Sequence, residues 1–335
     1  MKYSAALNNG KALGIIFMAK KLTGYIFVFI LVLLTATAAS CSGSGKNASV
    51  TQESTSGSTE PADTAPESES GSSGTDFDRD TSYSAETADA VISLNGESAS
   101  VEGGGAAWEN GAVVITKAGT YILKGTLSDG KIVVNAPKTD KIRLILEGVT
   151  ASCSTSAPIY IASADKVSLT LADGTQNIFE DAAAYVYAAG ETKPNACIYS
   201  SEDLTINGNG SLEVRGNSNN AIGCKNDLKI MSVNGKIVLS AINNALKGNE
   251  SVTIMGGDIT ILKSDDGIKS DDEIDAGKGY VYIGGGNITI TASDDAIQAV
   301  NSVTVKNCSV TVSVGGKTVN CDGLYEIADG CIIEK

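Results

Sequence analysis

The sequence predicts an all-β protein built as a single-stranded solenoid of the parallel β-helix type, with about 22 residues per coil. Three observations predict this fold. Between residues 219 and 316 one short pattern occurs four times, and each copy begins with a polar doublet. Within each copy, short apolar runs alternate with polar residues at a period of two, as in a strand with one buried face. Glycine and asparagine occupy the gaps, where the chain must turn.

The repeat is nearly constant in length. Its doublets are Asn219-Asn220, Asn243-Asn244, Asp265-Asp266 and Asp294-Asp295, which gives spacings of 24, 22 and 29 residues. The longest copy contains an insertion of about seven residues, 273–279, and has 22 residues without it. A weaker copy begins at Asn195. Repeats of this length form stacked units, because a single unit cannot bury its own apolar side.

Each copy supplies three short strands, and the alternation is clear where Val252 and Ile254 flank Thr253. Strands of this kind are expected to pair in parallel with the next coil at about 4.8 Å. A Greek-key sandwich is the alternative, but sandwiches do not repeat residue identity in register. Stacking predicts two inward-facing columns, which are Ile198, Ile222, Leu246, Ile268 and Ile297, and Leu204, Leu228, Val252, Val281 and Val303.

Composition divides the chain into three parts. Residues 1–40 carry Lys11, Lys20 and Lys21 before an apolar run of ten residues, 25–34, and are expected to be an export signal. Residues 41–88 consist mainly of Ser, Thr, Gly, Glu, Asp and Pro and are expected to be a disordered tether. Residues 89–335 are expected to form the solenoid domain, in which less regular strands over 90–181 begin the stack.

The small residues T-A-T-A-A-S precede Cys41, and this segment resembles the lipobox of bacterial lipoproteins, with Ala38 where leucine is usual. The resemblance implies that the cysteine is acylated and becomes the new N-terminus. We therefore expect Cys41 to carry a lipid anchor that holds the protein on the outer face of a bacterial membrane. Ordinary secretion after cleavage near Ala39 is the alternative.

Composition also excludes several functional classes. The chain has no histidine, which excludes Ser-His-Asp and Cys-His catalysis and histidine-ligated zinc. A net charge of −14 and a pI near 4.5 argue against a nucleic-acid partner. The cysteines after Cys41 form no C-x-x-C motif, and their pairing is open, with Cys321 and Cys331 closest in sequence. Cys197 occupies a position that is alanine in later copies, and we expect it to be buried.

Carboxylates concentrate around the third and fourth copies. Like charges stacked about 5 Å apart repel one another, so we expect a cation to neutralise them. Calcium accepts six to eight hard oxygen ligands in irregular geometry. The candidate ligands are Asp265, Asp266, Asp271, Asp272, Asp294 and Asp295. A solvated acidic edge is the alternative. Because earlier doublets are asparagine, we expect calcium between the third and fourth coils only.

Two pairs of residues are candidates for contacts with sugars. Lys247 and Lys269 share one outward column, and either could serve as the base of a lyase, although such lysines more often pair with acidic neighbours. Tyr280 and Tyr282 should face outward from one strand. Exposed rings on a rigid face can stack on sugars, but tyrosine is also a favourable strand residue.

The segments D-D-G-I-K-S-D-D-E and G-K-G-Y-V-Y-I-G-G-G-N-I-T-I, with S-S-E-D-L-T-I-N-G-N-G-S-L upstream, resemble a family of clostridial-type surface lipoproteins called carbohydrate-binding-domain proteins. The likeness covers about residues 90–316 and is most specific over 195–316. It implies a right-handed parallel β-helix with a pectate-lyase-like shape and with calcium at its aspartate turns. It also implies binding to cellulose and to acidic polysaccharides such as pectin and polygalacturonate.

We therefore expect a monomeric cell-surface lipoprotein whose right-handed β-helix binds plant-type polysaccharides without cleaving them and uses calcium for stability. A calcium-dependent, pectate-type polysaccharide lyase is one alternative, and a structural surface adhesin is another. A lyase would release an unsaturated uronide that absorbs ultraviolet light, and an adhesin of the structural kind would not be retained on cellulose.

Overall fold

The structure, a computed structural model, describes residues 76–187, 193–231 and 233–335. These residues belong to a compact unit that spans Ser70–Lys335. The export signal predicted for residues 1–40, the predicted lipidation of Cys41 and the tether before residue 76 lie outside the described residues. Within the described part the chain forms 28 strands and no helix, and thus no helix there could cross a bilayer.

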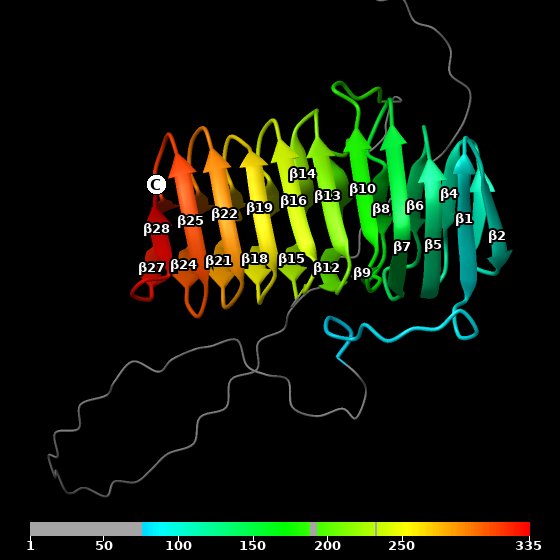
Figure 1. Ribbon diagram of the computed structural model, residues 1–335, viewed down its shortest axis with the longest axis horizontal. Coiled ribbons are helices and arrows are strands. Elements are labelled where there is room, and N and C mark those ends of the chain that lie inside the picture. The colour runs from blue at the N-terminus through cyan, green and yellow to red at the C-terminus, as the bar shows by residue number, and fades with distance from the viewer. Residues whose placement is uncertain (1–75, 188–192, 232) are drawn as a thin grey trace, which may run out of the picture. The chain divides into compact units, whose positions relative to one another are not determined.

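Ten strands form one sheet, and from β4 onward successive turns of the chain each contribute one strand to it; β4, β6, β8 and β14 are labelled in Figure 1. All neighbours in this sheet pair in parallel except β3 and β4, which are antiparallel. In order along the sheet the strands are β3 (Ala106–Glu109), β4 (Ala112–Ile115), β6 (Lys131–Asn135), β8 (Ile159–Ser163), β11 (Ala196–Ser200), β14 (Asn220–Cys224), β17 (Leu246–Gly248), β20 (Ile268–Ser270), β23 (Ile297–Ala299) and β26 (Val319–Cys321).

The other 18 strands form a larger sheet with two arms. The first arm contains β9 (Lys166–Leu171), β12 (Asp203–Gly208), β15 (Asp227–Ile230), β18 (Ser251–Ile254), β21 (Tyr280–Ile283), β24 (Ser302–Val305) and β27 (Leu324–Ile327). The second arm contains β10 (Gln176–Asp181), β13 (Ser211–Gly216), β16 (Lys236–Ala241), β19 (Asp258–Lys263), β22 (Asn287–Ala292), β25 (Ser309–Val314) and β28 (Ile332–Glu334).

The two arms are joined at the N-terminal end of the stack by β1 (Ala90–Gly96), β2 (Ala99–Gly103), β5 (Gly119–Leu127) and β7 (Lys141–Cys153). The first half of β7 pairs with β9 and its last residues pair with β10, so one strand belongs to both arms. Gly148 lies between these halves at a φ of 76°, a left-handed conformation that glycine adopts without a steric cost. The antiparallel hairpins β1–β2 and β3–β4 close this end.

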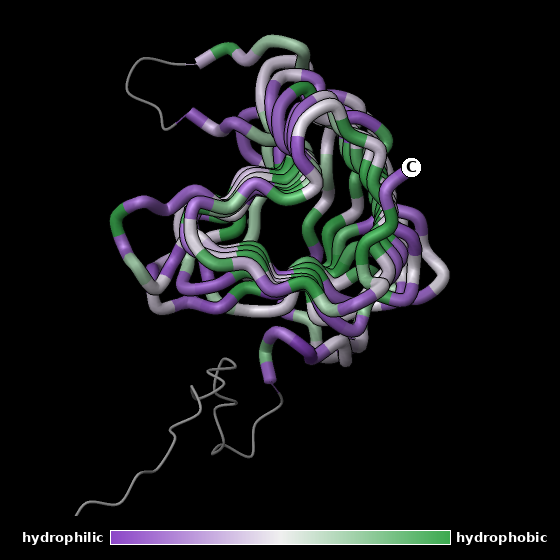
Figure 2. The backbone as a smooth tube through the Cα atoms, turned by 90° about the vertical axis from the view of Figure 1, so that its left-hand side faces the viewer, coloured by the Kyte–Doolittle hydropathy of each residue, from purple (hydrophilic) through white to green (hydrophobic). Residues whose placement is uncertain are grey.

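The stacking predicted from the repeat is confirmed. Ile222 pairs with Leu246, Leu246 with Ile268 and Ile268 with Ile297, so equivalent residues of successive copies lie side by side. Every residue of the two predicted inward columns is at most 1% exposed. Viewed along the stack, apolar residues line the inside of the coils and polar residues line the outside (Figure 2). One continuous apolar cluster extends from Ala90 to Cys331.

The asparagine doublets form a buried hydrogen-bond ladder where the chain enters the ten-stranded sheet. Asn220 Nδ2 donates to the carbonyl of Asn195 at 2.8 Å. Asn220 Oδ1 accepts hydrogen bonds from the main-chain and side-chain nitrogens of Asn244, at 3.1 and 2.8 Å. Asn220 and Asn244 are each 1% exposed. Since buried polar groups require partners, this ladder connects three successive turns.

The described chain begins with a segment that lies on the outer face of the first arm, and we call residues 76–88 the N-terminal strap. Arg143 of β7 donates to Asp80 Oδ2 at 2.6 Å and to the carbonyl of Ser82 at 2.9 Å. Tyr83 Oη donates to Glu147 at 3.1 Å. The sequence predicted a disordered tether that continues to residue 88. In the structure, residues 76–88 are instead attached to the solenoid. Composition did not reveal this because polar side chains form the strap's ion pairs and hydrogen bonds to distant strands, and few apolar residues, such as Tyr83 and Ala88, pack against the buried cluster of Ile122, Ile145 and Ala172.

All six cysteines that follow Cys41 carry free thiols. Cys197 is fully buried, as its position in the repeat predicted. Cys331 is not bonded to Cys321, its nearest cysteine in sequence, and lies instead beside Cys308. Burial, followed by the neighbouring Cys331 thiol, raises the pKa of Cys308 to about 12. The Cys308 thiol is therefore protonated at neutral pH and unreactive as a nucleophile.

We predict that Asn220→Ala lowers the free energy of unfolding by about 2–4 kcal/mol, because it leaves two buried nitrogens of Asn244 without an acceptor. Asn243→Ala is the matched control, since no described residue bonds to its half-buried side chain, and it should cost less than about 1 kcal/mol. Urea denaturation of both variants measures the difference. Equal losses would show that the ladder does not hold the turns.

Candidate cation-binding turn

The acidic doublets lie where the chain turns from the second arm into the ten-stranded sheet. Asp265 and Asp266 stand between β19 and β20, and Asp294 and Asp295 stand between β22 and β23. The turns stack in register, because the N–H of Asp294 donates to the carbonyl of Asp265 at 2.9 Å. The N–H of Asp295 also donates to Oδ1 of Asp266, at 3.2 Å. Main-chain pairing between adjacent coils therefore brings these carboxylates together.

The two members of each acidic doublet face different surroundings. Asp265 and Asp294 are exposed, as expected, whereas Asp266 and Asp295 are each only 4% exposed. The repeat predicts that the doublets stack as two polar ladders on the outside of the coils. For the second ladder, which consists of Asn220, Asn244, Asp266 and Asp295, this prediction is wrong, because all four side chains are buried. Asp266 and Asp295 each accept a main-chain N–H from the next coil, as Asn220 does in an earlier turn, whereas Asn244 Oδ1 accepts none from a described residue.

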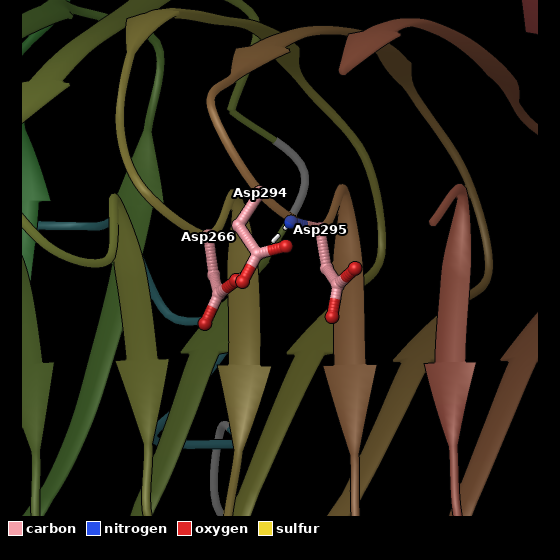
Figure 3. A group of neighbouring side chains, drawn as sticks. All are labelled: Asp266, Asp294 and Asp295. Atoms are coloured by element: carbon pink, nitrogen blue, oxygen red, sulfur yellow. Dashed lines mark hydrogen bonds between the residues drawn. The ribbon is translucent and has the colours of Figure 1, made fainter. Parts of the chain in front are cut away.

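Three carboxylates converge at this turn (Figure 3). One oxygen from each of Asp266, Asp294 and Asp295 lies within 4.8 Å of the other two. Asp295 accepts hydrogen bonds from the N–H of Lys317 and from the side-chain amide of Asn320, both at 2.7 Å. The carboxylate of Asp294 receives no hydrogen bond from any described residue. It is thus the group with the most capacity left for a ligand.

The charges at this turn do not balance. Of Asp265, Asp266, Asp294 and Asp295, only Asp266 forms an ion pair with a described residue, and its Oδ2 lies 3.0 Å from Lys269 Nζ. The carboxylate of Asp295, followed by desolvation and by the carboxylates of Asp266 and Asp265, raises the pKa of Asp294. A raised pKa means that the ionised form is disfavoured in the folded protein. A divalent cation placed among these oxygens would reverse this effect.

The turn also offers a neutral oxygen. Asn244 lies one coil before Asp266, is 1% exposed, and its Oδ1 atom has no hydrogen-bond partner among the described residues. Carboxylate and amide oxygens are hard donors, which suit calcium or magnesium and do not suit soft metals. The donor set therefore fits a hard cation held by Asp266, Asp294 and Asp295, with Asp265 and Asn244 nearby.

Two of the predicted ligands lie elsewhere. Asp271 and Asp272 follow β20, whereas Asp265 and Asp266 precede it, so the strand separates the two groups. Asp271 Oδ2 lies 2.6 Å from Lys247 Nζ. Asp272 accepts hydrogen bonds from the N–H groups of Ile274 and Asp275, at 2.8 and 3.1 Å, and these bonds lower its pKa. Asp272 thus shapes the start of the inserted loop.

Lys247 and Lys269 share one outward column, as predicted, with Gly223 and Gln298 in the neighbouring positions. Each lysine forms an ion pair, Lys247 with Asp271 and Lys269 with Asp266. Both ammonium groups are therefore paired with carboxylates. This is the structural role that the sequence suggested as the alternative to a lyase base.

Tyr280 and Tyr282 face outward from β21, with their neighbours Val281 and Ile283 inside. Lys306 Nζ lies 5.5 Å from the centroid of the Tyr282 ring. These tyrosines belong to the first arm, whereas Lys247 and Lys269 belong to the ten-stranded sheet. The four residues predicted to contact sugar are therefore divided between two surfaces.

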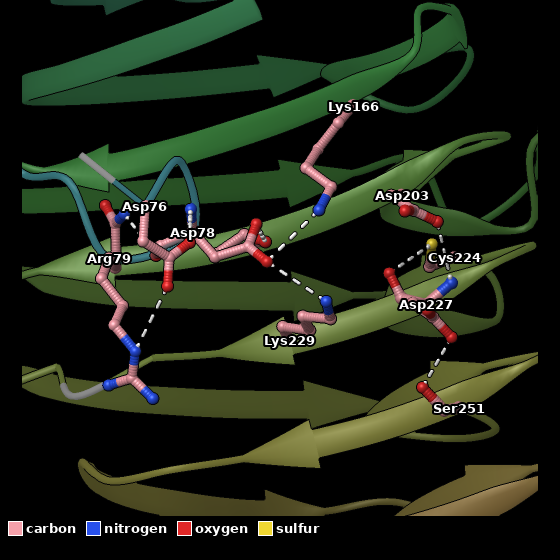
Figure 4. Close-up of polar contacts among 11 residues, drawn as sticks. Asp76, Asp78, Arg79, Lys166, Asp203, Cys224, Asp227, Lys229 and Ser251 are labelled. Carbon is pink, nitrogen blue, oxygen red and sulfur yellow. Dashed lines mark hydrogen bonds and ion pairs between the residues drawn. The ribbon is translucent and has the colours of Figure 1, made fainter. Parts of the chain in front are cut away.

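A further polar cluster, which the sequence did not reveal, lies beneath the N-terminal strap (Figure 4). Asp78 Oδ2 lies 3.3 Å from Lys166 Nζ and 3.1 Å from Lys229 Nζ, and Thr205 Oγ1 donates to Asp78 Oδ1 at 2.8 Å. These partners are far from Asp78 in sequence, so no local motif connects them. The one available signal was the run of polar residues at the outward positions of β9 and β12.

Stacked parallel strands around an apolar interior, with carboxylates converging at the turns, define a β-solenoid protein with a candidate cation site. The family model "Carbohydrate-binding domain-containing protein" matches residues 109–330. A protein of that description from Acetivibrio thermocellus is 45% identical over 221 residues, which cover 66% of this chain and 77% of the relative. The chain belongs to the carbohydrate-binding domain-containing protein family.

A solved structure is also similar, and it is described as "Structure of the polysaccharide lyase-like protein from C. thermocellum, Gadolinium derivative". It aligns with a TM-score of 0.71 at 47% identity and covers 74% of this chain and 99% of that chain. The likeness to a polysaccharide lyase-like protein agrees with the stacked parallel strands described above.

In metal-free buffer at pH 7, we predict that Asp294→Asn raises the melting temperature, because it removes a carboxylate whose ionised form its neighbours disfavour. Asp272→Asn should lower it, since the fold favours the ionised form of that group. The benefit of Asp294→Asn should shrink as the pH falls through the raised pKa of Asp294, because protonation removes the same charge. Calorimetry across pH 3–7 measures the direction of the change in melting temperature for each variant. A lower melting temperature of Asp294→Asn without metal would refute the charge imbalance.

Proposed function

We propose that this protein is a surface-attached module that binds acidic and neutral plant-type polysaccharides and is stabilised by calcium. The observation that carries this proposal is the membership of residues 109–330 in the carbohydrate-binding domain family. The fold supports it, because the main-chain pairing of the coils holds the outward side chains of the first arm in fixed rows. Rigid, preorganised surfaces lose little entropy when they bind a ligand. We propose further that the coils wind right-handed, with about 22 residues each.

Tyr280 and Tyr282 are the proposed stacking residues for sugar rings, because both face outward from one strand of the first arm. Lys306 next to Tyr282 adds a donor for hydroxyl groups. Lys247 and Lys269 form a second candidate surface on the ten-stranded sheet, where their ion pairs leave fewer free donors.

We predict that the double variant Tyr280→Ala/Tyr282→Ala weakens retention on insoluble cellulose by roughly 5–30-fold, which corresponds to about 1–2 kcal/mol for the loss of an aromatic contact. Tyr325→Ala is the control, because this tyrosine is exposed on β27 at the end of the stack. A pull-down series measures the retained fraction. Unchanged retention by the double variant would place sugar binding elsewhere, and failure of the wild type to bind any glycan would reject the proposed function.

The lyase-like description of the similar structure favours one second candidate, a polysaccharide lyase. In that reaction a base removes the proton α to the uronate carboxyl group, the bond from C4 to the leaving oxygen breaks, and a 4,5-unsaturated sugar forms. Lys269 or Lys247 would be the base. Incubation with polygalacturonate and calcium, followed at the ultraviolet absorbance of the product, tests this candidate, and absorbance that grows with time would favour the lyase over the binding module.

We propose that calcium binds at the turn formed by Asp266, Asp294 and Asp295, with Asp265 and Asn244 as further oxygen donors. The charge imbalance and the unpartnered Oδ1 of Asn244 support this site. The similar structure is described as a gadolinium derivative, and trivalent gadolinium is a hard cation that, like calcium, favours oxygen ligands. Calcium would neutralise the stacked carboxylates and connect two coils.

We predict that chelation lowers the melting temperature by roughly 5–10 °C, since saturation at about 100 times the dissociation constant contributes about 2.7 kcal/mol. Asp266→Asn/Asp295→Asn should remove this dependence, whereas Asn243→Ala should retain it. Differential scanning calorimetry with calcium and with chelator measures both. Equal melting temperatures of the wild type under the two conditions would exclude a calcium site at this turn.

We propose that the protein is an acylated lipoprotein, anchored through Cys41 to the outer face of a bacterial membrane. Cys41→Ala should release the protein into the growth medium, because a lipid chain supplies the membrane affinity. Fractionation followed by immunoblotting measures the distribution. Membrane retention of the Cys41→Ala protein would contradict the anchor, while release of both forms would favour ordinary secretion.

A further inference from the structure

On the outer face of the first arm, the outward side chains are more deeply buried on β9 and β12 than on β15 and β18. In β15 and β18 the outward-facing residues Lys229 and Thr253 are half-buried. In β9 and β12 the outward residues Ser168, Thr170 and Thr205 are at most 1% exposed. Ser168 pairs with Thr205 in register, and Thr205 pairs with Lys229. The N-terminal strap therefore covers one end of a continuous outward column.

Within the strap, one residue makes the closest contact with this surface. Asp78 is 9% exposed and is the sole residue of the strap classed as buried. Its carboxylate receives Lys166, Lys229 and Thr205 from three successive strands, β9, β15 and β12 (Figure 4). Further polar contacts hold the strap where Arg143 donates hydrogen bonds to Asp80 and to the carbonyl of Ser82. Two ammonium groups and one hydroxyl group thus surround the carboxylate of Asp78 and form a preorganised site for one carboxylate.

The strap satisfies this surface incompletely. Asn207 Nδ2 donates to the carbonyl of Asp78 at 2.9 Å, but no residue that the structure describes bonds to Asn207 Oδ1. Ser168 Oγ and Thr170 Oγ1 are also buried without a hydrogen-bond partner among the described residues. Asn207 pairs in register with Thr170, so the unpartnered groups lie beside the carboxylate site. Buried polar groups without partners are unfavourable, and a ligand rich in hydroxyl groups would provide the partners that the strap does not.

We propose that the surface formed by Lys166, Lys229, Thr205 and Asn207 is a binding site for the carboxylate of a uronic-acid sugar, and that Asp78 occupies it as an internal mimic until such a glycan displaces the strap. This inference rests on the proposed function. A uronate carries one carboxylate for the two lysines and neighbouring hydroxyls for the serine, threonine and asparagine groups. If a neutral glucan displaced Asp78, the two lysines would lose the carboxylate with which both form ion pairs.

The same column continues beyond the strap toward the predicted stacking residues. Lys229 pairs with Thr253, Thr253 with Tyr282 and Tyr282 with Thr304. Neighbouring strands lie about 4.8 Å apart, so this column forms an unbroken track across the first arm. Asp203 and Asp227 occupy an adjacent column, where Asp227 accepts a hydrogen bond from Ser251 Oγ at 2.7 Å. Among the described residues, Lys166 and Lys229 both form their ion pairs with Asp78 and not with these two carboxylates.

The test compares the intact chain with Asp78→Asn by calorimetric titration with hexagalacturonate and with cellohexaose. Removal of the competing carboxylate should tighten hexagalacturonate binding on the order of tenfold, because a larger fraction of the protein is binding-competent, and should leave cellohexaose unchanged. Asp76→Asn is the matched control, since Asp76 is exposed and pairs within the strap with Arg79. Lys229→Ala should weaken hexagalacturonate binding on the order of tenfold, whereas the exposed Lys124→Ala should not.

Hydrogen exchange of residues 76–88 provides the second readout. Saturating hexagalacturonate should deprotect these amides in the wild type, and cellohexaose should not. The inference is overturned if the strap stays protected, if Asp78→Asn leaves the affinity for hexagalacturonate unchanged, or if polyglutamate displaces the strap and hexagalacturonate does not. If the wild type binds glycans but neither the deprotection of the strap nor the affinity change of Asp78→Asn is observed, only this inference fails. When no variant binds any glycan, the proposed function fails with it.

Discussion

The structure depends on main-chain hydrogen bonding between successive coils in register. One coil contains three short strands and cannot bury its apolar side chains alone, so each coil is stable only through its neighbours. Parallel pairing places equivalent residues directly beside one another, as Ile222, Leu246, Ile268 and Ile297 show. Any residue that recurs in the repeat therefore becomes a column, whether it is apolar, neutral and polar, or charged.

Columns of different chemistry have opposite consequences. An asparagine column provides both donors and acceptors, and Asn220 and Asn244 bond to each other across the turn. An aspartate column provides acceptors alone, and its charges repel, as the raised pKa of Asp294 indicates. The change from asparagine to aspartate between the second and third copies thus replaces neutral hydrogen-bonding side chains with stacked charges, at the turn where we propose that calcium binds. The same geometry aligns Lys229, Thr253 and Tyr282 in one column on the first arm, and we propose this column as the track for an extended ligand.

Much of the fold could be predicted because the repeat itself encodes the register. The inward columns and the outward positions of Tyr280 and Tyr282 followed from the period of two. Three features could not be predicted. The burial of Asp266 and Asp295 depends on which side of the turn faces the next coil, and spacing does not specify this. The separation of Lys269 from Tyr282 depends on the bend between two sheets. The contacts of Asp78 join residues that are distant in sequence and have no shared motif.

Our central proposal is that the outer face of the first arm binds a polysaccharide while the aspartate turn holds a hard cation. A crystal structure of the intact chain with hexagalacturonate and calcium tests it most directly. We expect sugar density along the column of Lys229, Thr253 and Tyr282, and an ion among Asp266, Asp294 and Asp295. Sugar bound on the ten-stranded sheet beside Lys247 and Lys269, or an aspartate turn without an ion at saturating calcium, would contradict it.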